Sequence, residues 1–141
     1  MIIEARLQDM EDIYSLLCIL ENEQLNQKYF EEKYIQGLED NNVYYYVFIE
    51  NNKAVGFISL YIHNYLHHNQ LTGEIVELVV NPNYRSQRIG HQLINYVESL
   101  AKQLHLEEIE LSTSTYRKRA HHFYEVHGYI MNHYNYIKTL K

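Results

Sequence analysis

Residues 75–93 read IVELVVNPNYRSQRIGHQL, and this stretch decides the expected fold. The apolar run over residues 75–80 predicts a strand, and a Pro-containing turn follows it. Two arginines, Arg85 and Arg88, then lead with Gly90 into an amphipathic helix. This order of strand, basic loop and helix is typical of a site for a phosphorylated cofactor.

The start of that helix has the chemistry that phosphate binding requires. First-turn N–H groups have no intrahelical partner, and the helix dipole places partial positive charge at the same end. Gly90 permits close backbone approach, while Arg85 and Arg88 add positive charge. An ordinary strand-to-helix connection with surface arginines would be the preferred interpretation if this stretch stood alone.

A second stretch favours the phosphate-binding interpretation over an ordinary connection. Residues 120–129 read AHHFYEVHGY, which predicts a short helix closed by Gly128 and then a strand. In this order and at this spacing, the two stretches resemble the signature motifs of the GNAT superfamily of N-acetyltransferases. Arg85 and Gly90 stand at the first and last positions of its first motif, Arg/Gln-x-x-Gly-x-Gly/Ala.

Two residues depart from the superfamily pattern. Arg88 occupies the position of the first motif Gly, where a positive φ would strain a non-Gly residue unless the geometry is tolerant. At that position an Arg could also reach phosphate oxygens. Arg117 stands where many relatives have an Asn near the pantetheine arm, which puts that contact in doubt.

The resemblance implies that acetyl-CoA is the cosubstrate. Backbone groups of residues 78–80 would hold the pantetheine, which lies alongside like an added strand, and residues 85–91 would hold the pyrophosphate. The implied cofactor-binding residues are Leu78, Val79, Val80, Arg85, Ser86, Gln87, Arg88, Ile89, Gly90 and His91.

Length and charge narrow the class of protein. With 141 residues the chain is long enough for one domain, residues 1–141, whose core needs no disulfide or metal. The formal net charge of −6 argues against nucleic acid as the main partner. No apolar stretch reaches membrane-spanning length, and residues 1–6 match no signal peptide, so we expect a cytoplasmic protein without a membrane partner. The lone Cys18 lies in an apolar helical run and is interpreted as a buried structural thiol.

Strand and helix signals alternate along the chain. The expected strands are residues 2–6, 43–50, 53–63, 73–80, 108–112 and 129–139, and the expected helices are residues 9–22, 27–39, 89–104 and 117–127. Asp9 is a candidate N-cap, and Asn51-Asn52 has the chemistry of a hairpin turn. With the resemblance, this order predicts the α/β fold of GNAT acyl-CoA N-acyltransferases. That fold is a mixed central sheet of about six or seven strands flanked by about four helices, splayed between residues 73–80 and residues 108–112.

Acetyl transfer to an amine needs a base for the amine and an acid for the departing thiolate. The resemblance places Tyr124 at the position of the general acid, although outside the motif it would be interpreted as a core aromatic. The base stays open between Glu74 and Glu77, and either could instead be a solvated strand carboxylate. A regular strand points these two residues to opposite faces, but relatives often carry a bulge in this strand that would break the alternation.

The nine histidines suggest an acceptor site, although scattered exposed histidines are the simplest interpretation. Neutral His with Glu suits a divalent metal, and cationic His or Arg suits an anionic substrate group, so the sequence leaves a metal possible and its ligands unknown. The stretches at residues 63–80, 110–113 and 120–129 are similar to the aminoalkylphosphonate N-acetyltransferases. The likeness is good over residues 43–141 and loose over the first forty.

Enzymes of that family acetylate the amine of small aminophosphonates and are helped by a divalent metal. The resemblance therefore implies direct attack, in a ternary complex, by a small-molecule primary amine, with an aminoalkylphosphonate as the first candidate. The residues expected to line the acceptor site are His67, His68, Arg119, His121 and His133. The alternatives are a GNAT enzyme with a polyamine, aminoglycoside or protein N-terminus as acceptor, and a non-catalytic acyl-CoA-binding module. A homodimer is possible, since the sequence does not fix the oligomeric state.

Overall fold

A computed structural model describes residues 1–141. The chain divides into two compact units, residues 1–110 and residues 111–141. None of the helices combines the length and the apolar character that crossing a bilayer would require.

The first unit is built on a sheet whose five strands follow chain order. The strands are β1 (Ile2–Glu4), β2 (Val43–Glu50), β3 (Lys53–His63), β4 (Thr72–Val80) and β5 (Ile109–Leu111), the last of which ends at the first residue of the second unit. Neighbouring strands from β1 to β4 are antiparallel. β5 adjoins β4 only after the chain has passed through a helix, so hairpins build one part of the sheet and a crossover builds the other.

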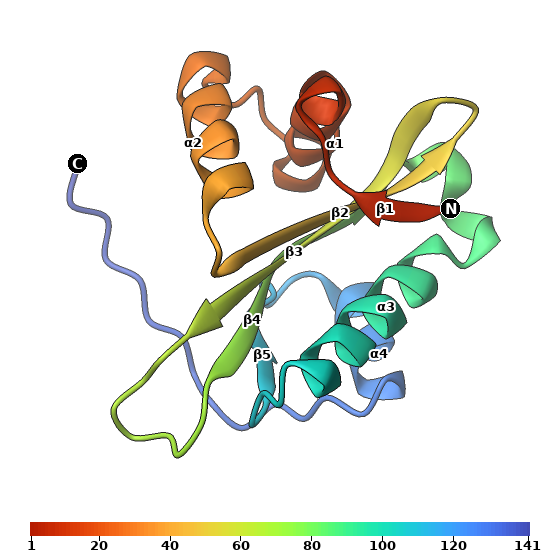
Figure 1. Cartoon of the computed structure of the whole chain (residues 1–141). Coiled ribbons are helices and arrows are strands. Elements are labelled where there is room, and N and C mark those ends of the chain that lie inside the picture. The colour runs from red at the N-terminus through yellow and green to blue at the C-terminus, as the bar shows by residue number, and fades with distance from the viewer. The chain divides into compact units, whose positions relative to one another are not determined.

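Helices cover both faces of this sheet. α1 (Met10–Glu21) and α2 (Gln27–Glu39) lie on one face, and α3 (Ile89–Gln103) lies on the other (Figure 1). Two short 3-10 helices, η1 (Leu7–Asp9) and η2 (Pro82–Gln87), precede α1 and α3. The expected α/β architecture of two helical layers around one sheet is therefore confirmed.

Apolar side chains explain why these layers pack. On the first face, Ile13 and Leu16 of α1 and Tyr34 of α2 are buried against Val47 and Phe57 of the sheet. On the second face, the buried side of α3 consists of Ile89, Leu93, Ile94, Val97 and Ala101. Each face removes several large apolar side chains from water, which is the main favourable contribution to folding.

A glycine sets how closely α3 approaches the sheet. A Cβ at Gly56 of β3 would lie 2.9 Å from Ile89 Cγ2 and 3.0 Å from Leu93 Cδ1, closer than side-chain packing allows. A larger residue would require the side chains of Ile89 and Leu93 to move. Gly56 therefore allows close packing against the helix end that was expected to bind phosphate.

The hairpin turn was predicted correctly, whereas two other local expectations, for Asp9 and Cys18, were not met in full. Asn51 and Asn52 have φ values of 51° and 62°, and positive φ at both positions is the signature of the type I′ hairpin turn that joins β2 to β3. Asp9 does precede α1, but its carboxylate accepts hydrogen bonds from the backbone N–H and the guanidinium of Arg6 instead of capping α1. Cys18 is only half-buried, so the expectation of a fully buried thiol was too strong.

The second unit contains α4 (Lys118–Val126), and Gly128 after it has φ 89°, as expected for the end of a helix. The predicted strand at residues 129–139 is wrong, because no strand forms after α4 and the sheet has five strands instead of six or seven. Ile130 and Ile137 are 80% and 83% exposed. Tyr and Ile give this segment local strand propensity, but a strand forms only where a neighbouring strand accepts its hydrogen bonds.

Candidate active site

A β-bulge interrupts β4 opposite Ser59. Ile58 pairs with Leu78 and Leu60 pairs with Ile75, so one residue of β3 faces two residues of β4. Such a bulge shifts the alternation of side chains by one position. The regular alternation of the strand is therefore broken where the two candidate bases lie.

The bulge brings Glu74 and Glu77 to the same face of the sheet. Glu74 accepts a hydrogen bond from His63 Nε2 at 2.8 Å, and Glu77 accepts one from the hydroxyl of Ser59. His63 and Ser59 are four residues apart on β3, so their side chains share a face. Phe57, two residues before Ser59, packs into the core beneath α1 and α2, which identifies the face. The opposite orientation expected for a regular strand does not occur.

The carboxyl group of Glu77 is largely removed from water. Burial raises the pKa of Glu77, and the hydrogen bond from Ser59 partly offsets that effect. The hydroxyls of Tyr45 and Tyr61 lie 3.2 Å apart on the same face, and burial raises the pKa of both phenols. The carboxylate thus lies among neutral hydroxyl groups, which suits a group that accepts a proton.

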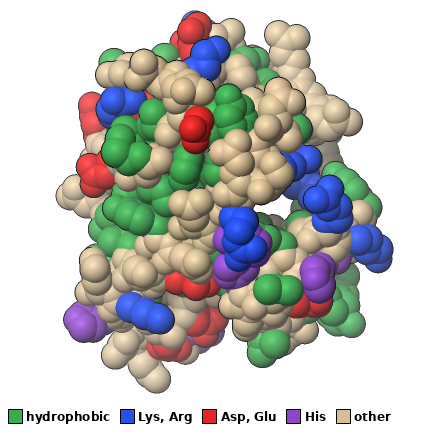
Figure 2. Space-filling view, turned by 90° about the vertical axis from the view of Figure 1, so that its right-hand side faces the viewer, with side chains coloured by type: hydrophobic (Ala, Val, Ile, Leu, Met, Phe, Trp, Pro, Cys, Tyr) green, Lys and Arg blue, Asp and Glu red, His purple; other side chains and the backbone are tan.

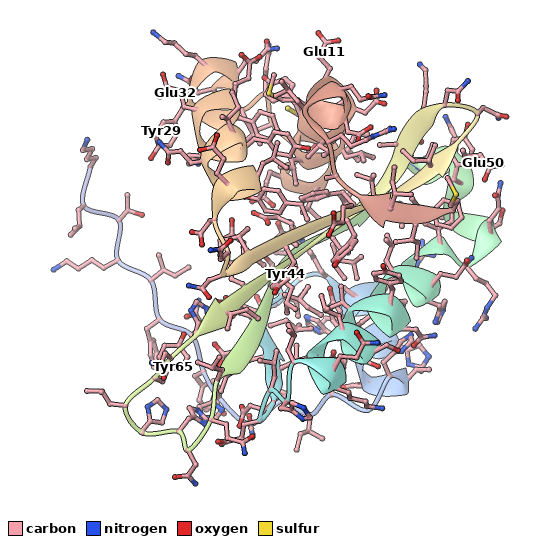
Figure 3. The ribbon with its side chains drawn as sticks, viewed as in Figure 1. Glu11, Tyr29, Glu32, Tyr44, Glu50 and Tyr65 are labelled. Atoms are coloured by element: carbon pink, nitrogen blue, oxygen red, sulfur yellow. The ribbon has the colours of Figure 1, made fainter.

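The histidine that is hydrogen-bonded to Glu74 belongs to a stack of aromatic rings. The ring of Tyr65 stacks on His63 at 4.9 Å and on His67 at 5.6 Å between ring centroids. Tyr65 belongs to the loop between β3 and β4 (Figure 3). Stacking therefore connects the partner of Glu74 to the exposed His67, one of the histidines expected at the acceptor site.

The next histidine of the loop has a different partner. His68 Nδ1 donates to Glu107 Oε2 at 2.7 Å, and the backbone N–H groups of Asn69 and Gln70 donate to Glu107 Oε1. The hydrogen bond to Glu107 raises the pKa of His68, and the same bond lowers the pKa of Glu107. We call His68, Glu107 and these two N–H groups the loop clamp, because they hold the β3–β4 loop to the segment before β5.

Two side chains of the loop clamp, together with Glu108, form a set with metal-ligand spacing. Ligand atoms of His68, Glu107 and Glu108 lie within 4.8 Å of one another. Both oxygens of Glu107 already accept hydrogen bonds, so a cation would have to displace His68 or the loop N–H groups. The arrangement is complete as a hydrogen-bonded clamp, and it lies apart from the carboxylates of the bulge in sequence and in bonding.

The expected phosphate-binding segment forms η2 and the start of α3. Arg88 adopts the left-handed conformation, with φ 58° and ψ 28°, at the N-cap of α3. The motif position of a glycine therefore does require positive φ, and the Arg side chain is accommodated at some strain. Arg85 and Arg88 are exposed, and the first turn of α3 contains no acidic residue. Figure 2 shows the side of the molecule that carries this helix end, where Lys and Arg side chains lie scattered among acidic and polar ones.

The end of β4 offers a backbone edge next to this segment. The Gly73 N–H donates to the carbonyl of Glu108 at 3.0 Å, which fixes where β5 meets β4. β5 has three residues and β4 has nine, so β5 itself does not reach Leu78–Val80. A ligand with amide groups could pair with that edge as an added strand does.

The remaining predicted residues belong to the second unit. Burial raises the pKa of Tyr124, and the charge of Arg117 acts in the opposite direction. His121 Nε2 donates to the carbonyl of Ser114 at 2.8 Å, so this ring nitrogen holds the turn before α4. Arg119 is exposed on the first turn of α4, and His133 Nδ1 contacts Asn132 Oδ1 at 2.6 Å in the exposed C-terminal segment. Arg119, His121 and Tyr124 lie on the expected helix, whereas His133 was expected on a strand that does not form.

Three site residues were missed by the sequence reasoning, namely Ser59, His63 and Glu107. Ser59 had a usable signal, because it is the one hydroxyl residue in the apolar run of residues 54–60. His63 and Glu107 had none, since their partners Glu74 and His68 are 11 and 39 residues away in the sequence, respectively.

Known proteins with similar sequences belong to one family. The model of the acetyltransferase (GNAT) family matches residues 8–129. The aminoalkylphosphonate N-acetyltransferase of Salmonella typhimurium is 40% identical over 136 residues, which cover 96% of this chain and 88% of the relative.

Solved structures share the fold. A transcriptional regulator from Bacillus halodurans has a TM-score of 0.91 at 22% identity, with 99% of both chains covered. An aminoglycoside acetyltransferase from an uncultured soil metagenomic sample has a TM-score of 0.85 at 21% identity, with 100% of this chain and 96% of that chain covered. At these identities the likeness establishes the fold alone.

Proposed function

Because the chain belongs to the acetyltransferase (GNAT) family, we propose that it moves the acetyl group of acetyl-CoA to the primary amine of an aminoalkylphosphonate. Family membership and the 40% identical relative make it an acetyl-CoA-dependent N-acetyltransferase. The observation that carries the choice of acceptor is that identity, which extends over 96% of the chain. Fold alone would not carry it, because one fold supports many acceptors.

The first chemical step is removal of a proton from the acceptor ammonium. An alkylamine is protonated near neutral pH, as the lysine side chain is, and its nitrogen has no lone pair to attack with until a base accepts the proton. We assign this role to Glu77, directly or through a water, because burial moves its pKa upward toward the working pH. Glu74, which is held by His63, would then lie on the same face and help to bind the ammonium.

The second step forms the amide and releases CoA. The amine nitrogen attacks the thioester carbonyl carbon, and collapse of the tetrahedral intermediate breaks the C–S bond. Tyr124 would donate its phenol proton to the departing sulfur, so that CoA leaves as the thiol. The raised pKa of Tyr124 keeps the phenol protonated at neutral pH, as a proton donor requires.

The cofactor would bind along the segment from β4 to α3. Leu78–Val80 would pair with the amides of the pantetheine, and residues 85–91 would receive the pyrophosphate at the helix end. Arg85 and Arg88 would contribute charge-assisted hydrogen bonds. Among the residues expected to line the acceptor site, His67 and Arg119 are exposed, and their side chains could donate hydrogen bonds to a phosphonate.

A thiol-release assay with acetyl-CoA tests the proposal. The acceptors would be 2-aminoethylphosphonate, a neutral-tailed amine of similar length, a polyamine and an aminoglycoside, each with and without a divalent metal or a chelator. We expect the highest kcat/KM for the aminophosphonate. A higher value for the polyamine or the aminoglycoside would reject the proposed acceptor and leave the N-acetyltransferase assignment intact.

A further inference from the structure

We propose that Ser59 is a positioning residue for the acetyl-transfer reaction, because its hydroxyl holds the carboxylate of Glu77 in place across the bulge of β4. This inference rests on the proposed function in one respect, namely that Glu77 acts as the base. Ser59 itself would not touch substrate, since its side chain is fully buried.

The bulge creates the need for such a residue. The ladder between β3 and β4 pairs Ile58 with Leu78 and Leu60 with Ile75, and it skips the residues between them. An extra residue in one strand leaves backbone groups that the ladder cannot satisfy. The N–H of Glu77 is one of these groups, and it donates to Ser59 Oγ at 2.9 Å. A buried N–H without that acceptor would be costly.

The same hydroxyl makes a second bond in the opposite direction. Ser59 Oγ donates its proton to Oε1 of Glu77, while it accepts the Glu77 N–H. The two hydrogen bonds join the Ser59 hydroxyl to the side-chain carboxylate and to the backbone N–H of Glu77, and so form a closed ring. A hydroxyl can donate and accept at once, and neither an alanine nor a second carboxylate can do so. The ring therefore fixes where the carboxylate points.

The surroundings of Glu77 would otherwise favour its neutral form. Burial raises the pKa of Glu77, and the bond from Ser59 is the main contribution in the other direction. The other titratable groups that act on this carboxylate lie on the helices and strands packed around it. They are Glu21 of α1, Lys33 of α2, Tyr45 of β2, Tyr61 of β3 and Glu74 of β4. Of these, only Lys33 favours the ionised form, so Ser59 supports both the position and the charge of the base.

The Ser59→Ala variant tests the inference through the pH profile. A base must be ionised, so kcat/KM falls as pH drops through the pKa of Glu77. Loss of the hydroxyl removes a bond to the ionised form, so the acidic limb should move to higher pH by about one unit. Ser59→Thr keeps a hydroxyl and should return the limb toward its original position. The matched control is Thr72→Val, because Thr72 of the same strand pair has a buried hydroxyl without a partner.

A double variant separates positioning from packing. In a Glu77→Gln background the hydroxyl has no base to position, so adding Ser59→Ala should change kcat/KM by less than about twofold. A purely structural role predicts the same loss at every pH and in both backgrounds, and that result would overturn the inference. If Ser59→Ala does not fold, Ser59→Cys keeps a weak donor of similar size and should give a smaller shift in the same direction.

A titration without substrate separates this inference from the proposed function. The carboxyl carbon of Glu77 can be followed by NMR against pH in the wild-type protein, in Ser59→Ala and in Thr72→Val. We expect a higher midpoint in Ser59→Ala alone. Equal midpoints in all three proteins would refute the role of Ser59. A raised midpoint in a protein that acetylates none of the amines would instead refute the proposed function.

Discussion

Glu77 in the bulge and Glu107 in the loop clamp are chemically identical side chains with opposite behaviour. Burial raises the pKa of Glu77, whereas the bond from His68 and two backbone N–H groups lower the pKa of Glu107. The carboxyl group of Glu77 is removed from water and accepts one side-chain hydrogen bond, from Ser59. The carboxyl group of Glu107 is exposed and accepts three hydrogen bonds. The difference teaches that surroundings, rather than residue type, decide whether the pKa of a carboxyl group is raised, as suits a base, or lowered, as in a group that holds a loop.

The largest expected effect separates the two carboxylates directly. Glu77→Gln removes the proposed base while keeping its size, so kcat/KM should fall by roughly 10²–10⁴ with acetyl-CoA affinity nearly unchanged. Steady-state kinetics and a CoA titration measure both quantities. Glu107→Gln is the matched control and should stay within a few-fold of wild type. Comparable losses in the two variants would break the comparison, and a larger loss in Glu74→Gln would transfer the role of base to Glu74.

Tyr124→Phe tests the acid that would complete the reaction. The expected loss in kcat is about 10²–10³, smaller than for the base, because a thiolate is a good leaving group that can depart without full protonation. Melting temperature and CoA affinity should be close to wild type, which would show that the fold is kept. Full turnover in a folded Phe variant would return Tyr124 to a purely packing role.

Arg85→Ala sharpens the comparison by changing cofactor binding without touching either carboxylate. Loss of one charge-assisted phosphate contact should weaken CoA binding by roughly 10- to 100-fold, with kcat at saturating acetyl-CoA largely retained. Calorimetric titration with CoA and with dephosphorylated pantetheine checks the origin of the effect. An equal loss for both ligands, or no loss for CoA, would remove Arg85 from the phosphate site.

Variants of the loop histidines test whether the region around the loop clamp binds the acceptor. His67→Ala with His68→Ala should raise KM for 2-aminoethylphosphonate by about tenfold, the value of one charged hydrogen bond, and KM for the neutral-tailed amine much less. His67→Ala alone should account for most of the change, because His68 already donates to Glu107. Equal changes in KM for both acceptors would mean that these histidines do not recognise the phosphonate group.

The smallest effect is on stability and depends on pH. The raised pKa of His68 stabilises the fold below its ordinary value of 6.5, and this contribution disappears as pH rises through the folded-state pKa. The lowered pKa of Glu107 stabilises above its ordinary value of 4.5, and this contribution disappears as pH falls through the folded-state pKa. The difference in melting temperature between wild type and Glu107→Gln should therefore be largest between about pH 4.5 and 6.5. It should be small throughout, because the pair is exposed to solvent, and a difference that grew above pH 8 would contradict the clamp.

Local chemistry explains why much of the fold could be predicted. The bounds of α2, β2 and β3 agree with the expected residues 27–39, 43–50 and 53–63 because periodicity and turn residues encode them within a few positions. The positive φ of Arg88 was left open by the sequence, because a motif shows which residue departs from the pattern but not which backbone conformation that position adopts. The segment at residues 129–139 failed for the opposite reason, since a strand needs a partner that its own sequence does not contain.

The sequence by itself determined the family, the order of the elements and the basic helix end, because each of these depends on residues that are contiguous in the chain. Only the tertiary structure decided the chemistry of the carboxylates. The bulge that brings Glu74 and Glu77 to one face, and the bond between Ser59 and Glu77, depend on the register of β3 against β4. Register and burial arise when distant segments pack, and they set the pKa of a group through the water and the donors that it loses or gains.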